Sequence, residues 1–308
     1  MWGDVKSEPV LVFHGIMDNA GSFDNLIPLL PQSFYYICID LPGHGRSSHL
    51  PSFLPIHSTD HLLVYRIIAE YFNREKYLIM GHSYGGQISI LFAQLYPKYV
   101  SALILFDTFY FYPSAPKFFM NKLIESHDLL LKMQKQAKED KPTYTYEEAL
   151  NKLINNRNYG TLDQKSAEPI LKRMIQSVGD DKYVFTIDQR LKSFQNPSGN
   201  IAYIIDLLLQ RPVRCSVLII VGSESTAQTV YFKPLIKYLK KNKFIIKVVN
   251  GDHNVHNTFA ERIAPIVRKF LLKIKHKLYT VVLFNDLQHR IILAFPSLHN
   301  RYHSFREV

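Results

Sequence analysis

Short apolar runs alternate with amphipathic stretches along the first third of the chain. Continuous runs of apolar or β-branched residues occupy residues 9–14, 34–40, 77–80 and 102–106. Apolar runs of this length, without a regular polar alternation, indicate strands that are buried on both faces, as in a parallel sheet. We therefore predict four neighbouring parallel strands in this part of the chain.

Helical patterns lie between these runs. Within residues 59–72, Leu62, Leu63, Ile67 and Ile68 fall at helical spacing, and residues 86–95 predict a second helix shortly before Pro97. Alternation of strands and helices is typical of a doubly wound α/β sheet with right-handed crossovers. The expected fold class is therefore α/β, with a mostly parallel sheet.

The alternation stops near residue 109. From there to about residue 211, polar residues with periodic Leu and Ile predict several helices, and strands resume at 216–221 and 244–249. An insertion between two strands of one sheet is expected to cover the carboxyl edge of the sheet, where ligands bind in such folds. We divide the chain into a first core part (1–108), a helical cap (109–212), a second core part (213–272) and an unassigned basic tail (273–308).

Composition narrows the class of protein and of partner. The 308 residues are 47% hydrophobic and 20% charged, which supports a large core and excludes a disordered or coiled-coil chain. The formal net charge is +11, and nine basic against two acidic residues from Arg262 onward carry most of that excess. Because the rest of the chain is close to charge balance, we expect a solvated tail and no nucleic-acid partner.

Two further features bear on location. No apolar run approaches the roughly 20 residues that span a bilayer, so we expect no transmembrane segment. The first residues lack a basic stretch followed by an apolar one, and the last three are not a peroxisomal signal. We therefore expect a cytoplasmic protein.

The most specific motif is the hexapeptide GHSYGG at residues 81–86. It follows a predicted strand and precedes a predicted helix, which is the context of the G-x-S-x-G nucleophile elbow. The turn is tight and strained, so glycine is needed where a Cβ would clash. Ser83 is the expected nucleophile, exposed at the tip of the turn.

A serine nucleophile needs a base, and two histidines follow the last predicted strand. His253 comes directly after a Gly-Asp turn, whereas His256 falls in the first turn of the following helix. We favour His253 as the base. The order of serine before histidine is that of α/β-hydrolases.

An oxyanion hole requires two backbone N–H groups that point at the developing negative charge. The residues after the first strand and after the nucleophile are suited to this role. We expect the N–H groups of Ile16 and Tyr84 to form it, and we expect His14 to be structural.

Six separated motifs together resemble one family. HGIMDNAGSFDNLIPLLP, DLPGHGRSSH, GHSYGGQ, LILFDT, IDQRL and GDHNVH are similar to the serine hydrolase-like proteins of the α/β-hydrolase superfamily, a group that includes insect kraken. The resemblance runs from about residue 2 to about residue 272. It implies an α/β-hydrolase fold, Ser83 as nucleophile, His253 as base, no cofactor and no metal.

The sequence departs from this family in three places. Similar proteins begin with two strands before the segment that starts here at Pro9, so the sheet is expected to lack its N-terminal edge strands. The segment after Leu272 matches nothing in the family. Most relatives also carry an acid in a Gly-x-x-Asp turn after the strand at 216–221, where this chain has Ser225, with Glu224 one residue earlier.

Two candidates remain for the acid. Asp107 ends the strand that follows the nucleophile helix, a place where haloalkane-dehalogenase-like relatives carry their triad carboxylate. Glu224 lies closer to the commoner place. We favour Asp107 and keep Glu224 as the alternative.

The function expected from these residues is hydrolysis of a small carboxylic ester through an acyl-enzyme. Thioesters, amides and lactones stay open, and the aromatic run at residues 109–112 suggests a small apolar acyl substrate. The alternative is a catalytically inactive member of the fold that binds a ligand or a partner.

Overall fold

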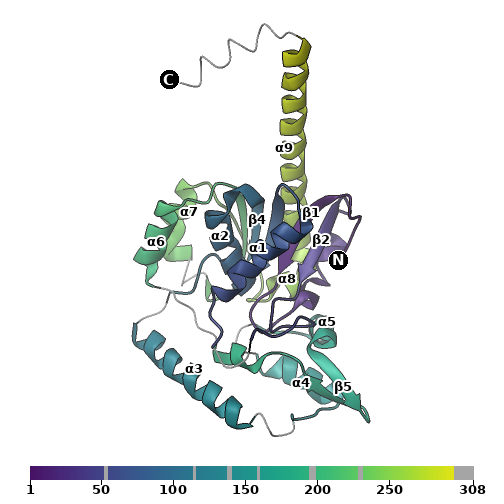
Figure 1. Ribbon diagram of the computed structural model, residues 1–308, viewed down its shortest axis with the longest axis vertical. Helices are drawn as coiled ribbons and strands as arrows, with labels where there is room; N and C mark the ends of the chain where they lie inside the picture. The colour runs from purple at the N-terminus through teal and green to yellow at the C-terminus, as the bar shows by residue number, and fades with distance from the viewer. Residues whose placement is uncertain are drawn as a thin grey trace. The chain divides into compact units, whose positions relative to one another are not determined.

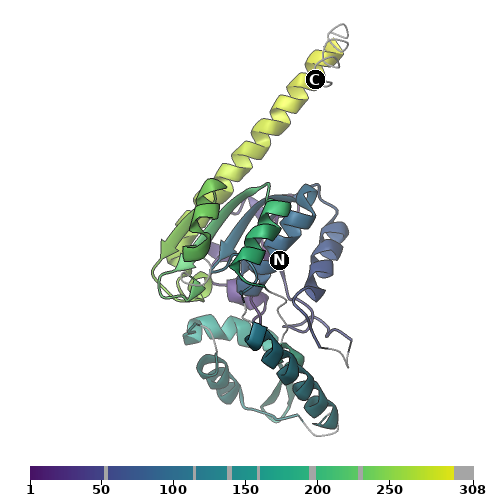
Figure 2. The ribbon, with the colours of Figure 1, turned by 90° about the vertical axis from the view of Figure 1, so that its left-hand side faces the viewer.

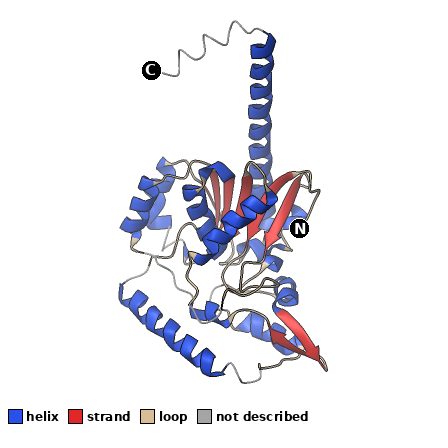
Figure 3. Cartoon of the chain, in the orientation of Figure 1, coloured by secondary structure: helices blue, strands red, loops and turns tan. Residues whose placement is uncertain are grey.

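A computed structural model describes residues 1–51, 55–113, 116–136, 141–157, 160–193, 199–227 and 232–294. Six parallel strands form one sheet in the order β2-β1-β3-β4-β7-β8, seen in red in Figure 3. The strands are β1 (Glu8–Phe13), β2 (Phe34–Ile39), β3 (Tyr77–His82), β4 (Val100–Phe106), β7 (Ser216–Gly222) and β8 (Ile245–Val249). All six strands predicted from the apolar runs are confirmed, with ends that differ by one or two residues.

Helices α1 (Asp60–Phe72) and α2 (Ser83–Leu95) connect the early strands and match the predicted helices. The later helices are α6 (Ile201–Gln210), α7 (Lys233–Lys241), α8 (Val255–Thr258) and α9 (Ala260–Ala294). Three short 3-10 helices complete this part: η1 (Ala20–Phe23), η2 (Ile27–Leu29) and η3 (Pro97–Tyr99). Every residue of β3 is buried, as expected of a central parallel strand covered on both faces.

The segment between β4 and β7 contains the predicted cap. Its first helices are α3 (Pro116–Gln136), α4 (Tyr146–Asn155) and α5 (Gln164–Met174), which Figures 1 and 2 show together at one end of the sheet. The 3-10 helix η4 (Gln189–Ser193) follows later in the segment. A separate hydrophobic cluster joins α4, α5 and η4. Helix α6 differs, because its Ile204 and Leu208 pack into the main cluster of the sheet.

The cap also contains a β-hairpin that the sequence pattern did not predict. Strands β5 (Ile175–Gly179) and β6 (Lys182–Phe185) pair antiparallel. Asp180 and Asp181 join them, and both have positive φ angles, 48° and 51°, as the central residues of a type I′ hairpin turn do. The strands are largely exposed, so they lack the continuous apolar run on which the prediction of strands depended.

The outer edge of β2 pairs briefly with the start of the chain. Trp2 and Tyr36 exchange two backbone hydrogen bonds of 2.9 Å in an antiparallel bridge. A single bridge therefore stands beside β2, in the place where the family resemblance led us to expect missing edge strands.

Helix α9 continues through the tail that the sequence left unassigned, and the chain divides within it into two compact units, Met1–Pro265 and Ile266–Val308. Residues 295–308 lie outside the described part. Among the described residues, no helix is both long and apolar enough to cross a membrane.

Candidate active site

Ser83 occupies the sharp turn between β3 and α2. Its φ angle is +47°, a left-handed conformation that costs an L-residue about 1–2 kcal/mol. Gly81 makes the turn possible, because a Cβ there would lie 2.6 Å from the backbone of Gly86. The strained turn and the close approach are those expected of a nucleophile elbow.

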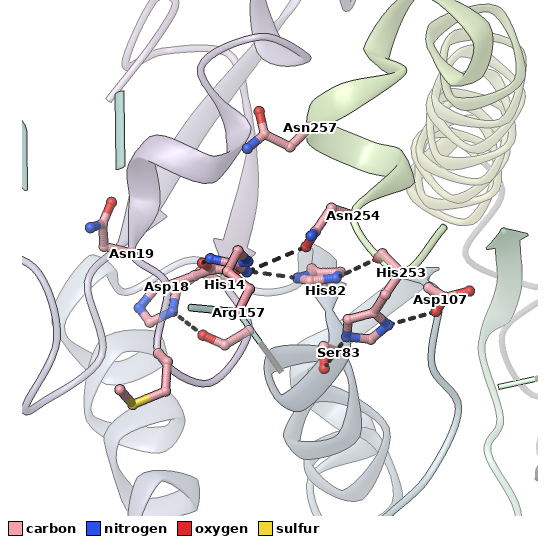
Figure 4. A network of polar contacts seen from close by, with 12 residues as sticks. His14, Asp18, Asn19, His82, Ser83, Asp107, Arg157, His253, Asn254 and Asn257 are labelled. Carbon is pink, nitrogen blue, oxygen red and sulfur yellow. Dashed lines mark hydrogen bonds and ion pairs between the residues drawn. The ribbon is translucent and has the colours of Figure 1, made fainter. Parts of the chain in front are cut away.

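His253 lies between Ser83 and Asp107, as Figure 4 shows. Its Nε2 atom is 2.9 Å from Ser83 Oγ, and its Nδ1 atom is 2.6 Å from Asp107 Oδ2. The three residues come from the end of β3, the end of β4 and the connection between β8 and α8. Because these strands are parallel, their carboxyl ends meet at one edge, and residues up to 170 positions apart become neighbours.

Asp107 is held from several sides. Its side chain is fully buried, and its Oδ1 accepts a 2.9 Å hydrogen bond from the backbone N–H of Gly222. Its Oδ2 also accepts from the hydroxyl of Ser225, and its own N–H donates to Ile220 at 2.7 Å. Two strand ends, β4 and β7, therefore fix the carboxylate that faces the histidine.

Glu224, the alternative acid, does not share this position. It lies in an exposed turn, where its backbone N–H donates to Gly251 at 3.0 Å. The acid that the structure places beside His253 Nδ1 is Asp107.

The two residues expected to form the oxyanion hole flank Ser83. Ile16 follows β1 and lines the same cavity as Ser83, and Tyr84 is the next residue of α2. The first N–H groups of a helix have no partner within the helix, and the helix dipole favours an anion there. The role of these two N–H groups in an oxyanion hole stays a prediction.

His14 has a structural environment. Its Nε2 accepts a hydrogen bond from the N–H of Leu41 at 2.9 Å, so its Nδ1 carries the proton and donates to Gly15 at 2.8 Å. Burial lowers the pKa of His14, which is consistent with a neutral ring.

His256, the competing base, is fully buried among other rings. Its ring stacks on that of His82 at 3.8 Å between centroids and lies 4.9 Å from the ring of Phe23. Burial lowers the pKa of His256 to about 3 and that of His82 well below its usual range. His82 donates from Nε2 to the backbone oxygen of His253 at 3.0 Å, so both rings support the loop that carries His253.

A buried ion pair joins the cap to the turn after β1. Arg157, just beyond α4, donates from Nη1 and Nη2 to the two carboxylate oxygens of Asp18, at 2.8 and 3.2 Å. The side chains are 13% and 2% exposed, so the pair is largely shielded from solvent. Arg157 Nη2 also lies 3.5 Å from the side-chain oxygen of Asn254, the residue after His253.

Thr161 makes a second connection between the cap and the histidine loop. Its N–H and its hydroxyl both donate to Asp252 Oδ2, at 2.5 and 2.7 Å. Gly160 has a φ of +66°, and a Cβ there would lie 2.5 Å from Asn254 Nδ2 and 3.1 Å from His253 Cβ. The cap backbone therefore passes directly against the residues that position His253.

Sequence reasoning missed these connections. Asp18 belongs to the motif after the first strand, but no spacing rule relates it to Arg157, which lies 139 residues away in a helical insertion. A buried arginine in a polar helical segment carries no sequence signal that separates it from its solvated neighbours.

Ser83 and His253 line a cavity of about 990 Å³, whereas Asp107 lies buried behind His253. Core residues at its lining include Ile16, Asp18, His82, Ser83 and His253, and the cap supplies the other walls. Among the described residues, no group of three or more His, Cys, Asp or Glu side chains is arranged to hold a metal ion.

Comparison with known proteins identifies the group to which this arrangement belongs. The family model described as the alpha/beta hydrolase fold matches residues 8–257. A serine hydrolase-like protein of Danio rerio is 31% identical over 281 residues, covering 88% of this chain and 83% of that protein. A probable serine hydrolase of Drosophila melanogaster is 31% identical over 279 residues, covering 88% and 82%.

Solved structures share the fold. The hypothetical protein PA1622 of Pseudomonas aeruginosa superposes with a TM-score of 0.72 at 25% identity, covering 88% of this chain and 94% of that one. A thioesterase domain from the curacin biosynthetic pathway gives a TM-score of 0.68 at 19% identity, covering 86% and 92%.

Proposed function

The chain belongs to the α/β-hydrolase family and is similar to its serine hydrolase-like members, and from this premise we propose that it hydrolyses a small carboxylic ester or related acyl substrate through an acyl-enzyme. The observation that carries the proposal is the hydrogen-bonded series from Asp107 through His253 to Ser83. This series has the connectivity that activates a serine hydroxyl.

Acylation follows from the orientation of the imidazole. With its Nδ1–H donating to Asp107, the neutral ring presents the Nε2 lone pair to the Ser83 hydroxyl. Nε2 takes the proton as Oγ attacks the carbonyl carbon, and the N–H groups of Ile16 and Tyr84 stabilise the oxyanion. The protonated Nε2 then gives the proton to the leaving alkoxide, and an ester of Ser83 remains.

Deacylation uses the same groups in reverse. His253 Nε2 takes a proton from water, the hydroxide adds to the acyl carbonyl, and collapse of the intermediate returns the proton to Ser83 Oγ. The products are a carboxylic acid and an alcohol. The chemistry requires no group beyond this chain and water.

A fluorophosphonate probe tests the proposal directly. It reacts with an activated serine, so we expect the wild-type protein to be labelled and Ser83→Ala not to be. A burst of nitrophenol equal to the enzyme concentration, released from p-nitrophenyl acetate, would be the kinetic evidence for the acyl-enzyme. A folded wild-type protein that neither reacts with the probe nor releases nitrophenol would support the alternative, a binding protein without activity.

A further inference from the structure

On the cap side of the cavity, basic side chains outnumber acidic ones. Four lysines at the lining come from four different cap segments: Lys122 from α3, Lys141 from the connection that follows, Lys152 from α4 and Lys192 from η4. Residues 109–212 contain 15 Lys and Arg against 12 Asp and Glu, so the cap as a whole is close to balance. Of its described acidic residues, Asp188 alone is part of the cavity lining, and Glu125 pairs with Lys122 next to it.

The two carboxylates at the cavity lining each form an ion pair with an arginine. Asp188 is 3% exposed and accepts from Arg190 Nη2 at 2.6 Å. Burial would raise the pKa of Asp188, but its hydrogen bonds with Arg190 outweigh that effect and lower it. Asp18 is held by Arg157 in the ion pair described above. Neither carboxylate balances the cap lysines.

Three of the four lysines have no carboxylate partner among the described residues. Lys141, Lys152 and Lys192 are exposed, and within the described part of the chain no carboxylate lies within ion-pair distance of them. Lys122 pairs with Glu125 at 2.5 Å on the surface of α3. Lys152 Nζ lies 4.9 Å from the ring centroid of Tyr144, which also lines the cavity. A cleft lined by one sign of charge concentrates ligands of the opposite sign.

Apolar side chains complete the cap lining. The cavity includes Met133, Leu153, Met174, Phe185 and Leu191 as well as the lysines. A ligand that fits this composition has an apolar part and an anionic part, with its reacting carbonyl at Ser83.

We propose that the cavity binds an acyl substrate that carries a carboxylate or a phosphate away from its reacting carbonyl, recognised by the cap lysines. The inference rests on the proposed hydrolase function and names the substrate class for the same site. The anion can belong to the acyl chain, as in a half-ester of a dicarboxylic acid, or to the leaving group, as in a thioester of a phosphorylated thiol.

Two matched substrate pairs distinguish an anion on the acyl chain from an anion on the leaving group. Mono-p-nitrophenyl adipate and p-nitrophenyl hexanoate differ in a terminal carboxylate against a methyl group. The hexanoyl thioesters of 4′-phosphopantetheine and of pantetheine differ in one phosphate on the leaving group. We expect the charged member of one pair to have a kcat/KM about tenfold higher at low salt, with a preference that falls as ionic strength rises.

Substitutions of single lysines identify the side chains that cause the preference for the charged substrate. Lys152→Met and Lys192→Met should each reduce the preference for the charged substrate by about two- to fivefold, as expected for exposed charges. Lys132→Met is the matched control, because Lys132 is an exposed lysine of α3 that does not line the cavity. Equal rates for both members of both pairs, or an equal effect of Lys132→Met, would overturn the proposal.

Binding to Ser83→Ala makes the test independent of turnover. By calorimetry, adipate and hexanoyl-4′-phosphopantetheine should bind more tightly than their neutral counterparts, hexanamide and hexanoyl-pantetheine, and the added Lys152→Met change should weaken the binding of one anion. If anions bind in this way but Ser83 of the wild type is not labelled by a fluorophosphonate, the proposed hydrolase activity fails and the anion site stands. If labelling occurs but neither anion binds more tightly than its neutral counterpart, the hydrolase stands and the anion site fails.

Discussion

The two walls of the cavity are built differently. On the core side, Ser83, Asp107 and His253 lie at or beside strand ends, and hydrogen bonds from neighbouring strands and loops hold them. On the cap side, the lysines are exposed and extend from helices and connections. Groups that make and break bonds need fixed geometry, whereas groups that select a substrate by charge tolerate looser placement. The sheet can therefore keep the same catalytic residues while substitutions in the cap change which substrate is preferred.

The largest expected effect comes from the core wall. Ser83→Ala should lower kcat by roughly 10⁶, the loss typical of removing the nucleophile from such a unit. Alanine has the same Cβ at the strained turn, so the melting temperature should change by less than about 2 °C. Steady-state kinetics and a thermal scan check both expectations. Activity within tenfold of wild type would contradict the role of Ser83.

The acid gives the next largest effect. Asp107→Asn should lower kcat by about 10⁴, because the imidazole loses the partner that fixes its tautomer. Glu224→Gln should cost less than tenfold, since Glu224 lies in an exposed turn. The ratio of the two kcat values, measured on one ester, decides between them. A reversed ratio would assign the acid to Glu224.

Arg157 belongs to the cap, but its buried ion pair with Asp18 holds it in place as firmly as the core residues are held. It therefore tests whether the difference between the two walls applies to every residue of the cap. Arg157→Met leaves Asp18 buried without its partner, which should cost about 3–5 kcal/mol of the free energy of unfolding. It also removes a contact with Asn254 beside His253, so we expect kcat to fall by about tenfold.

The double variant Arg157→Met with Asp18→Asn separates the two effects. Removing both charges should restore most of the stability but not kcat, because the contact with Asn254 is still absent. Urea denaturation and kinetics of the same samples measure both quantities. Recovery of kcat together with stability would mean that Arg157 acts on structure alone.

The smallest effect on activity is expected from His256. Its folded-state pKa of about 3 lies below the value near 6.5 of the unfolded chain. The unfolded state therefore binds the extra proton as pH falls below 6.5, and stability present at neutral pH is lost toward pH 3 at about 1.4 kcal/mol per unit.

His256→Leu removes this titration. Between pH 7 and pH 5 the variant should lose about 2 kcal/mol less of its free energy of unfolding than the wild type, with kcat at pH 7.5 within threefold. Urea denaturation at several pH values provides the comparison. Parallel pH profiles for the two proteins would show that His256 does not titrate on unfolding.

The sequence predicted those parts of the molecule that depend on local patterns. Strand positions followed from continuous apolar runs, and the surroundings of Ser83 followed from a motif whose strand and helix are adjacent in the chain. His253 was favoured over His256 from its place after a turn. Asp107 was favoured over Glu224 from its place at a strand end, but Glu224 stayed open because the choice depends on which strand end faces the imidazole in three dimensions.

The cap was less predictable than the core. The β5–β6 hairpin is exposed and short, so it has neither an apolar run nor a buried alternation to reveal it. The Arg157–Asp18 pair joins residues with no local relation, and the four cavity lysines resemble any solvated lysines until the fold brings them to one cavity.

The contact between Ser225 and Asp107 limits the charge that this edge of the sheet can hold. Ser225 lies at the place where the family resemblance leads us to expect an acid, and its hydroxyl touches the carboxylate of Asp107 although 118 residues separate the two in the chain. The carboxyl ends of β4 and β7 therefore bring two positions of the chain to one point near the imidazole of His253. Two carboxylates at one such point share a proton rather than both ionise, so an aspartate at residue 225 would add a proton to the site and not a second negative charge.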